Sequence, residues 1–442
     1  MKTVLPRTSK EIVEMGNQYS FYTWHAQKDP SLRTMAIDYG KGCYIYDVDG
    51  NEYFDMASEL VNVNVGHGRQ RIVDAIAAQA SKIPYCRPSD MTAVRAALSK
   101  KIIEEFAPAN MAKVMYSGGG AEANEFAIRL AKAATGRTKI LSQYMSYHGS
   151  SYGTAVLSGD TVHEAPDPAI PGFVRFYGPN WSTCKAKFKT EEERCEFLVG
   201  ILKDTIELEG AETIAAIFFE SITGGNGAIV PPKGYYEAAR KICDEHGILM
   251  VADEVMVGFC RTGKNFACQH FDYLPDMITF AKGSTCGYLP LGGVIISKKL
   301  SDIFDEVGVP CGCTYSGHAA CCAAALETLE IYQEENLADN AAKMGDYLSE
   351  KLEELKEKHS SVEEITGKGL MKAVHFDTKI YQVKNYVDKI TEAFLERKVI
   401  VSSRTGAFLV VPPLIVTKEQ IDYIIGIIDD VLSLTDEWIA AV

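Results

Sequence analysis

The chain has 442 residues, a formal net charge of -14 at pH 7, and 47% hydrophobic and 24% charged residues. Its length exceeds the size at which one hydrophobic core usually stops growing, so we expect a globular protein with two packed lobes. The acidic balance argues against nucleic acid or an anionic membrane surface as the main partner, because both attract clustered Lys and Arg.

The first part of the chain contains a hairpin-like pattern over Gly42–Tyr53, in which Asp49-Gly50 is a strong turn signal. This part lacks the alternation of strands and helices found further along, so we expect it to join a smaller lobe. We predict that residues 1–69 belong to the small domain, 70–320 form a large domain, and 321–442 form the C-terminal small domain.

The middle of the chain alternates short β-branched runs with helical patterns. This alternation predicts an α/β fold with a mostly parallel central sheet covered by helices. The predicted buried strands are 113–116, 139–141, 215–219, 248–252, 277–280 and 293–297, and the predicted helices are 121–134, 191–209 and 234–245.

The C-terminal third has a different pattern. Residues 337–358 form a long amphipathic helix rich in Lys and Glu, and residues 370–376 and 408–411 are extended. A last helical pattern runs from Lys418 to about residue 434. Helices and short strands in this order predict a smaller α+β domain.

A glycine-rich segment, Ser117–Glu125, follows the first predicted strand of the large domain and leads into a helix. Glycines let the backbone approach a ligand, and the start of a helix presents unpaired N–H groups that suit a phosphate. Many glycine-rich turns are only tight connections, so this segment alone is weak evidence.

Two ionisable residues follow predicted strands of the same sheet. Asp253 comes directly after one strand and Lys282 closely after the next. Each has an ordinary explanation, since a strand-end acid is often a cap and a lysine often extends its amine to solvent. A lysine so close to a buried strand is nevertheless unusual, and its amine is the group that a Schiff base requires.

Together, a phosphate loop, a strand-end acid and a strand-end amine match the needs of pyridoxal 5'-phosphate (PLP). This cofactor has a phosphate, a ring nitrogen that pairs with an acid, and an aldehyde that condenses with lysine. An aspartate at Asp253 favours the protonated ring nitrogen, which makes the ring an electron sink.

The chain resembles, over nearly its whole length, the class III (ω-amino acid) aminotransferases of the fold-type-I PLP superfamily. Within that family, the string Gly119–Glu125 and the context Ser146–Gly149 are most similar to the taurine and β-amino acid branch. The resemblance rests on these segments: Ser117–Glu125, Tyr147–Gly149, Asp253–Val255, Gly258–Gly263, Ala281–Gly283, Thr314–His318 and Pro412–Leu414.

The resemblance implies a role for each matched residue near the cofactor ring. Lys282 forms the Schiff base and then moves the proton between substrate and cofactor, and Asp253 pairs with the ring nitrogen. Val255 and Tyr147 pack on the two ring faces, with His148 beside Tyr147. The alternative for Tyr147 is an ordinary buried aromatic residue.

The resemblance also implies how the phosphate is bound. Gly119, Gly120 and Ala121 offer backbone N–H groups, and Ala121 stands where many relatives have Ser or Thr, so the loop depends more on its backbone. Thr314 matches a residue that reaches the phosphate bound by the neighbouring subunit, which implies a two-fold homodimer with sites at the interface.

Two further positions are suggested less directly. Glu220 ends the strand 215–219, where the family places an acid near the cofactor, but Ser221 follows it in place of the usual Pro. Arg404 resembles the flexible arginine that binds the acid group of ω-amino acids, because a planar guanidinium suits a carboxylate or sulfonate. A surface arginine is the alternative.

An aromatic group near the N-terminus completes the predicted site. Tyr22 and Trp24, with Tyr19 and Phe21 nearby, lie in the region that shapes the substrate pocket of relatives. The alternative is a buried aromatic cluster that pins this segment to the large domain. The sequence favours a β- or ω-amine donor, such as taurine, β-alanine, GABA or a β-aminoacyl compound, with pyruvate or 2-oxoglutarate as acceptor.

Other functions use similar sequences. Aminomutases and amino-acid racemases share the cofactor apparatus, and differ in whether the aminated cofactor is released. A non-enzymatic binding module is disfavoured by the intact Lys282, Asp253 and Tyr147. A nucleotide-binding Rossmann protein is disfavoured because GxGxxG with a following acid is missing.

The compartment is predicted from targeting signals and cysteines. The start, Met1–Pro6, is followed by polar sequence without the apolar core of a signal peptide, and no stretch is suited to a membrane span. The twelve cysteines do not show the paired CxxC spacing of a structural zinc site. We therefore expect reduced thiols, no metal and a cytoplasmic location.

Overall fold

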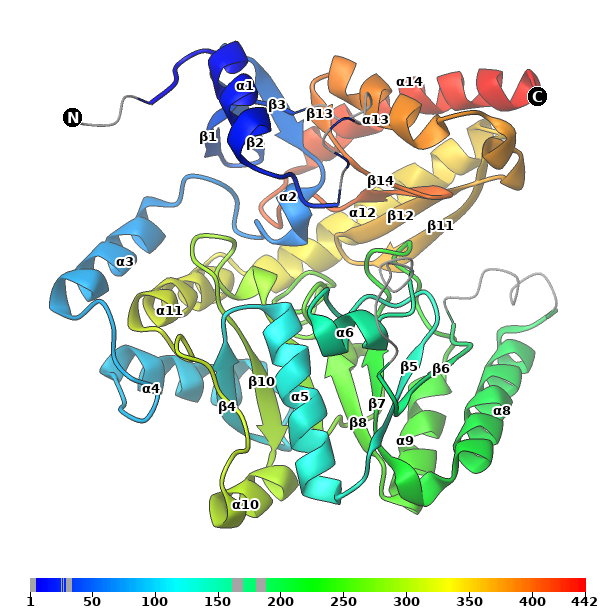
Figure 1. Ribbon diagram of the computed structural model, residues 1–442. Helices are drawn as coiled ribbons and strands as arrows, with labels where there is room; N and C mark the ends of the chain where they lie inside the picture. Colours follow the sequence, from blue (N-terminus) through cyan, green and yellow to red (C-terminus); the bar gives the residue numbers. More distant parts are fainter. Residues whose placement is uncertain (1–4, 25, 27, 29–33, 161–169, 180–187) are drawn as a thin grey trace.

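The computed structural model describes the whole chain except residues 1–4, 25, 27, 29–33, 161–169 and 180–187 (Figure 1). Its centre is a seven-stranded sheet with the order β4-β10-β9-β8-β7-β5-β6. β10 runs in the opposite direction to the other strands of this sheet, which all point the same way. The prediction of a mostly parallel sheet is therefore confirmed. The strands are β4 (Met111–Ser117), β5 (Lys139–Gln143), β6 (Phe173–Phe176), β7 (Ile214–Glu220), β8 (Leu249–Asp253), β9 (Met277–Phe280) and β10 (Gly292–Ser297).

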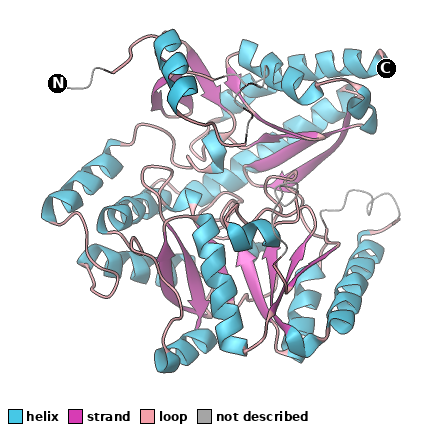
Figure 2. Cartoon of the chain, in the orientation of Figure 1, coloured by secondary structure: helices cyan, strands magenta, loops and turns pink. Residues whose placement is uncertain are grey.

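Helices cover both faces of this sheet, as Figure 2 shows. On β7, Phe218 packs in a cluster with α5 and α10, whereas Phe219 packs on the opposite face with α8, α9 and α11. Burial on both faces explains why the central strands are continuously apolar in sequence. The helices of this region are α3 (Gln70–Lys82), α4 (Ala93–Lys101), α5 (Gly120–Thr135), α6 (Tyr152–Leu157), α8 (Glu191–Glu209), α9 (Tyr235–His246), α10 (Lys298–Val307) and α11 (Ala319–Glu334).

A second lobe lies above the central sheet in Figure 1 and contains two four-stranded sheets. One consists of β11 (Val362–Lys368), β12 (Met371–Phe376), β15 (Ala407–Val410) and β14 (Ser402–Arg404). The other joins the N-terminal strands β1 (Ile37–Lys41), β2 (Tyr44–Asp47) and β3 (Glu52–Asp55) to β13 (Val399–Ile400), which is parallel to β3. The remaining helices are α1 (Ser9–Tyr19), α2 (Ser58–Val61), α12 (Leu337–Lys358), α13 (Tyr386–Glu396) and α14 (Lys418–Ala440).

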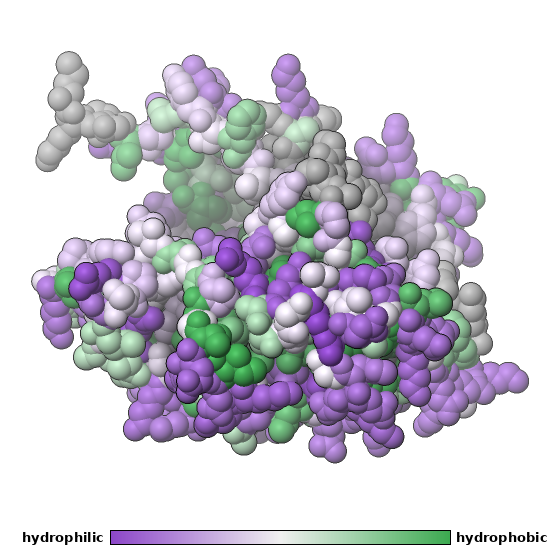
Figure 3. All heavy atoms as spheres, turned by 60° about the horizontal axis from the view of Figure 1, so that its bottom comes forward, coloured by the Kyte–Doolittle hydropathy of each residue, from purple (hydrophilic) through white to green (hydrophobic). Residues whose placement is uncertain are grey.

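The pairing of β3 with β13 places the start of the chain beside its C-terminal third, while the numerical domain boundaries stay a prediction. Within the described residues, no helix is long and apolar enough to cross a bilayer. On the face drawn in Figure 3, hydrophilic residues predominate and hydrophobic ones form a few separate groups.

One buried arginine joins three distant parts of the chain. The side chain of Arg261, which follows β8, is completely buried. Its guanidinium donates to the carbonyl oxygens of Leu370 (3.0 Å) and Pro412 (2.6 Å), to Oδ1 of Asn64 (2.6 Å) and to Oγ of Ser58 (3.3 Å). Burial lowers its pKa to about 10, yet the group remains a cation at neutral pH. The guanidinium thus links the N-terminal segment and the C-terminal third to the large domain.

We expect Arg261→Met to lower the free energy of unfolding by at least about 3 kcal/mol, because each buried acceptor left unpaired costs about 1–3 kcal/mol. Urea unfolding monitored by circular dichroism measures this loss. Arg137→Met is the matched control, since Arg137 also donates to three carbonyl oxygens but remains partly exposed. Equal losses in the two variants would contradict the special role of Arg261.

Candidate active site

The three chemical groups predicted from sequence meet at one edge of the central sheet. Both β4 and β9 are antiparallel to β10, so they run in the same direction, and β8 is parallel to β9. Ser117 at the end of β4 pairs with Gly292, and Asp253 at the end of β8 pairs with Thr279 of β9. The segments that follow β4, β8 and β9 therefore emerge together, at the edge where open α/β sheets bind ligands.

The glycine-rich segment ends in the start of α5. Gly119 precedes this 16-residue helix without a side-chain cap, so the N–H groups of its first turn are available to an anion. A Cβ built on Gly120 would lie 2.7 Å from Cγ1 of Val255, so only glycine fits there. Gly118 N–H donates to Oε2 of Glu122 at 2.7 Å, which closes the loop on its own helix.

Asp253 is 4% exposed, and its carboxylate accepts bonds from several segments. Oδ1 accepts from the N–H of Val255 at 3.0 Å. Oδ2 accepts from Nδ2 of Asn124 at 2.8 Å and lies 2.7 Å from Nδ1 of His148. Burial acts to lower the pKa of His148, but the hydrogen bond to Asp253 and its charge outweigh this and raise the pKa. His148 therefore lies behind Asp253 and supports it.

Asn124 was not singled out from the sequence, although it lies within the glycine motif. Its side-chain amide also donates to the carbonyl of His148 at 2.8 Å, so one Nδ2 group joins α5 to both partners of the carboxylate. The available signal was spacing: Asn124 is four residues after Gly120, and residues at i and i+4 share a helix face.

Lys282 begins a short 3-10 turn, Lys282–Ser284, just after β9. Its φ is +42°, a left-handed conformation that costs a residue other than glycine about 1–3 kcal/mol. Burial lowers the pKa of its amine to about 8, although the nearby charges of Asp253 and Glu220 act in the opposite direction. The amine is thus far more often unprotonated at neutral pH than an exposed lysine.

Glu220 lies beside this group at the end of β7. It accepts from the N–H of Tyr147 at 2.9 Å and from the N–H of Gly224 at 2.7 Å. Burial raises its pKa to about 7, and the charge of Asp253 adds to this while His148 opposes it. Glu220 therefore fixes the backbone that carries Tyr147, whose ring is partly buried.

Arg404 reaches the same region from β14 of the second lobe. Burial raises the pKa of Tyr147 and lowers that of Lys282, and the positive charge of Arg404 acts to lower both as a smaller influence. The residue remains solvent-exposed in the single chain. A cationic side chain of the small lobe therefore acts on the amine and the aromatic ring of the large lobe.

Three predicted residues are not joined to this group by any contact among the described residues. Thr314 is exposed, and its carbonyl accepts from the hydroxyl of Tyr85 at 3.1 Å. Tyr22 packs beside α1, and Trp24 is 66% exposed. In the single chain Phe21 is 92% exposed, so these aromatic side chains form no buried cluster among the described residues.

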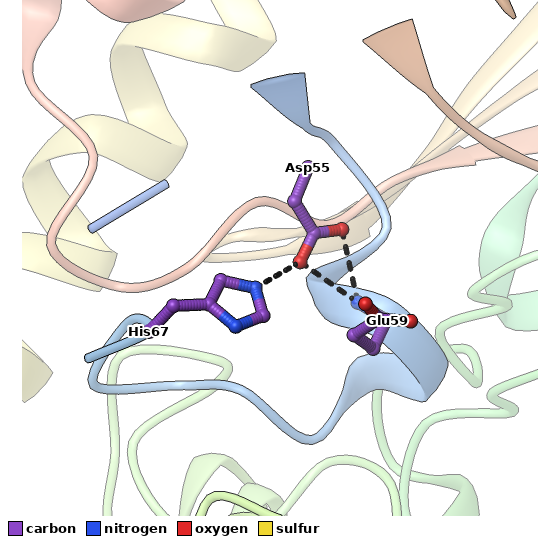
Figure 4. A group of neighbouring side chains, drawn as sticks. All are labelled: Asp55, Glu59 and His67. Atoms are coloured by element: carbon purple, nitrogen blue, oxygen red, sulfur yellow. Dashed lines mark hydrogen bonds and ion pairs between the residues drawn. The ribbon is translucent and has the colours of Figure 1, made fainter. Parts of the chain in front are cut away.

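A second group of ionisable side chains lies on the N-terminal segment (Figure 4). Asp55, Glu59 and His67 bring potential metal-ligand atoms within 4.8 Å of one another. The buried carboxylate of Asp55 is 2.9 Å from Nε2 of His67, and it accepts from the N–H of Glu59 at 2.9 and 3.0 Å. These hydrogen bonds pair the buried carboxylate of Asp55 and stabilise the bend at α2. The cluster is thus explained by a structural role, without a metal ion.

Comparisons with known proteins agree with this geometry. The family model "Aminotransferase class-III" matches residues 25–432, and the chain belongs to this family. A taurine–pyruvate aminotransferase of Bilophila wadsworthia is 32% identical over 97% of this chain and 98% of its own. A probable gamma-aminobutyrate transaminase 4 of Oryza sativa subsp. japonica is 32% identical over 94% of this chain and 90% of its own.

A solved structure is similar over the whole length. The taurine:2-oxoglutarate aminotransferase from Bifidobacterium kashiwanohense, in complex with PLP and glutamate, is 38% identical, covers 99% of both chains and gives a TM-score of 0.93. The chain is thus a PLP-dependent transaminase of fold type I, and the predictions of family, fold and cofactor are confirmed.

The residues present fit PLP. The uncapped start of α5 suits a phosphate, the buried carboxylate of Asp253 suits a ring nitrogen, and an amine with a pKa of about 8 suits a carbonyl. Val255 packs closely against Gly120 and adds an apolar wall to the site.

We expect Asn124→Ala to reduce PLP affinity and transamination about tenfold, because Asp253 loses one of its charge-assisted hydrogen bonds. Fluorescence titration with PLP and steady-state rates measure the effect. Asn340→Ala is the matched control, since the side-chain amide of Asn340 also donates two hydrogen bonds, but both go to backbone carbonyls and neither to a carboxylate. A loss of stability in both variants with no loss of PLP affinity in Asn124→Ala would show a purely structural role.

Proposed function

We propose that the chain transfers the amino group of a β- or ω-amino acid to pyruvate or 2-oxoglutarate. Candidate donors are taurine, β-alanine, GABA and β-aminoacyl compounds. The observation that carries the proposal is the position of Arg404, whose charge acts on both Tyr147 and Lys282. An arginine at that position binds a carboxylate or sulfonate while the amine at the other end of the same molecule lies near Lys282. The names of the relatives support taurine and GABA among these donors.

The residues of the chain would divide the work as follows. Bound PLP supplies an electron sink and carries the amino group between the two substrates. Lys282 holds the cofactor and moves the proton at the substrate carbon, and its low pKa keeps the amine available as a base. Asp253 holds the proton on the ring nitrogen, with Asn124 and His148 behind it.

The remaining predicted residues would bind and enclose the cofactor. Backbone N–H groups of Gly119, Gly120 and Ala121 hold the phosphate at the start of α5. Tyr147 and Val255 enclose the ring and exclude water.

A homodimer would complete the site. Thr314 is exposed in the single chain, and the neighbouring Tyr315 is 64% exposed, as expected of a loop that binds a second subunit. In that arrangement Thr314 contacts the phosphate bound by the partner, and Tyr22 and Trp24 shape a substrate pocket. A reducing compartment such as the cytoplasm suits the free cysteines of the described residues.

Borohydride reduction of the PLP-loaded protein should attach the cofactor covalently to Lys282. Lys372 is the internal control, because it is 6% exposed and burial also lowers its pKa to about 8, yet it lies on β12. Peptide mass spectrometry identifies the modified lysine, and Lys282→Ala should leave none. An adduct on Lys372, or no adduct at all, would contradict the assignment of Lys282 as the lysine that holds PLP.

We expect Arg404→Gln to raise KM for taurine or β-alanine about 10- to 100-fold, which corresponds to a lost charge-assisted hydrogen bond of about 1.5–3 kcal/mol. KM for an amine without an acid group should stay nearly unchanged. Arg397→Gln is the control on the same lobe, since its guanidinium bonds the carbonyl of Ala393. Equal effects on acidic and neutral amines would refute acid binding by Arg404.

A further inference from the structure

A buried tyrosine makes a hydrogen bond to the turn in which Lys282 has its left-handed backbone conformation. Lys282 has φ +42°, and the next residue of the turn, Gly283, directs its backbone carbonyl toward α11. This carbonyl accepts a hydrogen bond of 2.7 Å from the hydroxyl of Tyr332, on α11. The bond joins this mostly buried helix to the turn that carries the amine.

Gly283 is closely surrounded, and a side chain at this position would not fit. A Cβ built on Gly283 would lie 2.6 Å from Nδ2 of Asn64, 3.2 Å from Cβ of Phe259 and 3.2 Å from the oxygen of Tyr332. Tyr332 is 2% exposed, and its ring lies nearly parallel to that of Phe259, with centroids 6.4 Å apart. The turn is therefore enclosed by three side chains from three segments.

A thiol continues the chain of donors. Sγ of Cys286 is 3.3 Å from the Tyr332 oxygen, and it accepts from the N–H of Val65 at 3.4 Å. Because the only proton of Tyr332 points to Gly283, the thiol proton has two acceptors in this group, the tyrosine oxygen and the carbonyl of Gly283 itself, 3.6 Å from Sγ. Burial raises the pKa of Tyr332 well above its ordinary value, so the hydroxyl remains a donor throughout the neutral range. Hydrogen bonds that share atoms in this way polarise and strengthen one another.

We propose that Tyr332, supported by Cys286, is a positioning residue that holds the Lys282 turn in its left-handed conformation and keeps the amine in its buried position. Tyr332 contacts neither substrate nor cofactor, and acts through the carbonyl of Gly283. The proposal rests on the proposed function only in that Lys282 is the residue that holds PLP.

The test is Tyr332→Phe, which removes one hydroxyl and keeps the ring. In the full-length protein freed of PLP, competitive labelling with acetic anhydride and peptide mass spectrometry give the pH at which Lys282 is half protonated. Wild type should show a midpoint near pH 8, and the variant about one pH unit higher, because the relaxed turn lets the amine reach water. At pH 7 the unprotonated fraction, and with it the rate of PLP capture and kcat, should fall about tenfold, with KM nearly unchanged.

Three further variants separate this role from general packing. Cys286→Ala should move the midpoint in the same direction by a smaller amount, and Cys286→Ser, which keeps a donor, should behave as wild type. Tyr235→Phe is the control, since Tyr235 is another buried tyrosine whose hydroxyl bonds Gln143, and its midpoint should not move. If Tyr332→Phe does not fold, the two Cys286 variants decide.

Equal midpoints in wild type, Tyr332→Phe and Cys286→Ala would overturn the proposal even if borohydride traps PLP on Lys282. If borohydride traps no PLP on Lys282 of wild type, the proposed function fails instead, and the labelling still reports whether Tyr332 controls the amine.

Discussion

The site depends on one buried carboxylate. Asp253 ends a central strand at 4% exposure, where an unpaired charge is costly, and it persists because donors from α5, from the segment after β5 and from its own strand end converge on it. These bonds also fix the relative positions of the segments that supply them. The carboxylate thus organises the edge of the sheet, and in the proposed function it is the partner of the protonated ring nitrogen.

The second constraint is the joint between the lobes. Arg261 bonds the N-terminal segment and the C-terminal third without a carboxylate partner, so its charge is dispersed over neutral acceptors. The bonded carbonyls of Leu370 and Pro412 lie next to β12 and β15, in the sheet whose strand β14 carries Arg404.

Two lysines illustrate how location decides function. Burial lowers the pKa of both Lys282 and Lys372 to about 8, so weak basicity alone does not distinguish them. Lys372 is on a strand of the small lobe and donates to the carbonyl of Gly367. Lys282 lies beside Asp253 and Glu220 on a left-handed turn. The chemistry follows from the neighbours of the amine and from the backbone that aims it.

Much of the fold followed from the sequence. The predicted strand 277–280 and the helices 191–209 and 337–358 coincide with β9, α8 and α12, because apolar strands buried on both faces and amphipathic helices leave clear patterns. The edge strand β6 was missed, since Phe173–Phe176 is short and only partly buried. The last helix extends to Ala440 rather than about residue 434.

The sequence by itself determined the family, the cofactor and the residues that meet at the sheet edge, because in a parallel sheet the position of a residue after its strand dictates where it emerges. Only the tertiary structure decided that Asn124 and His148 support Asp253, that Arg404 acts on Lys282, and that Tyr332 bonds the Lys282 turn. These partners lie from tens to more than a hundred residues apart, and their pairing depends on how helices and lobes pack, which local patterns do not encode.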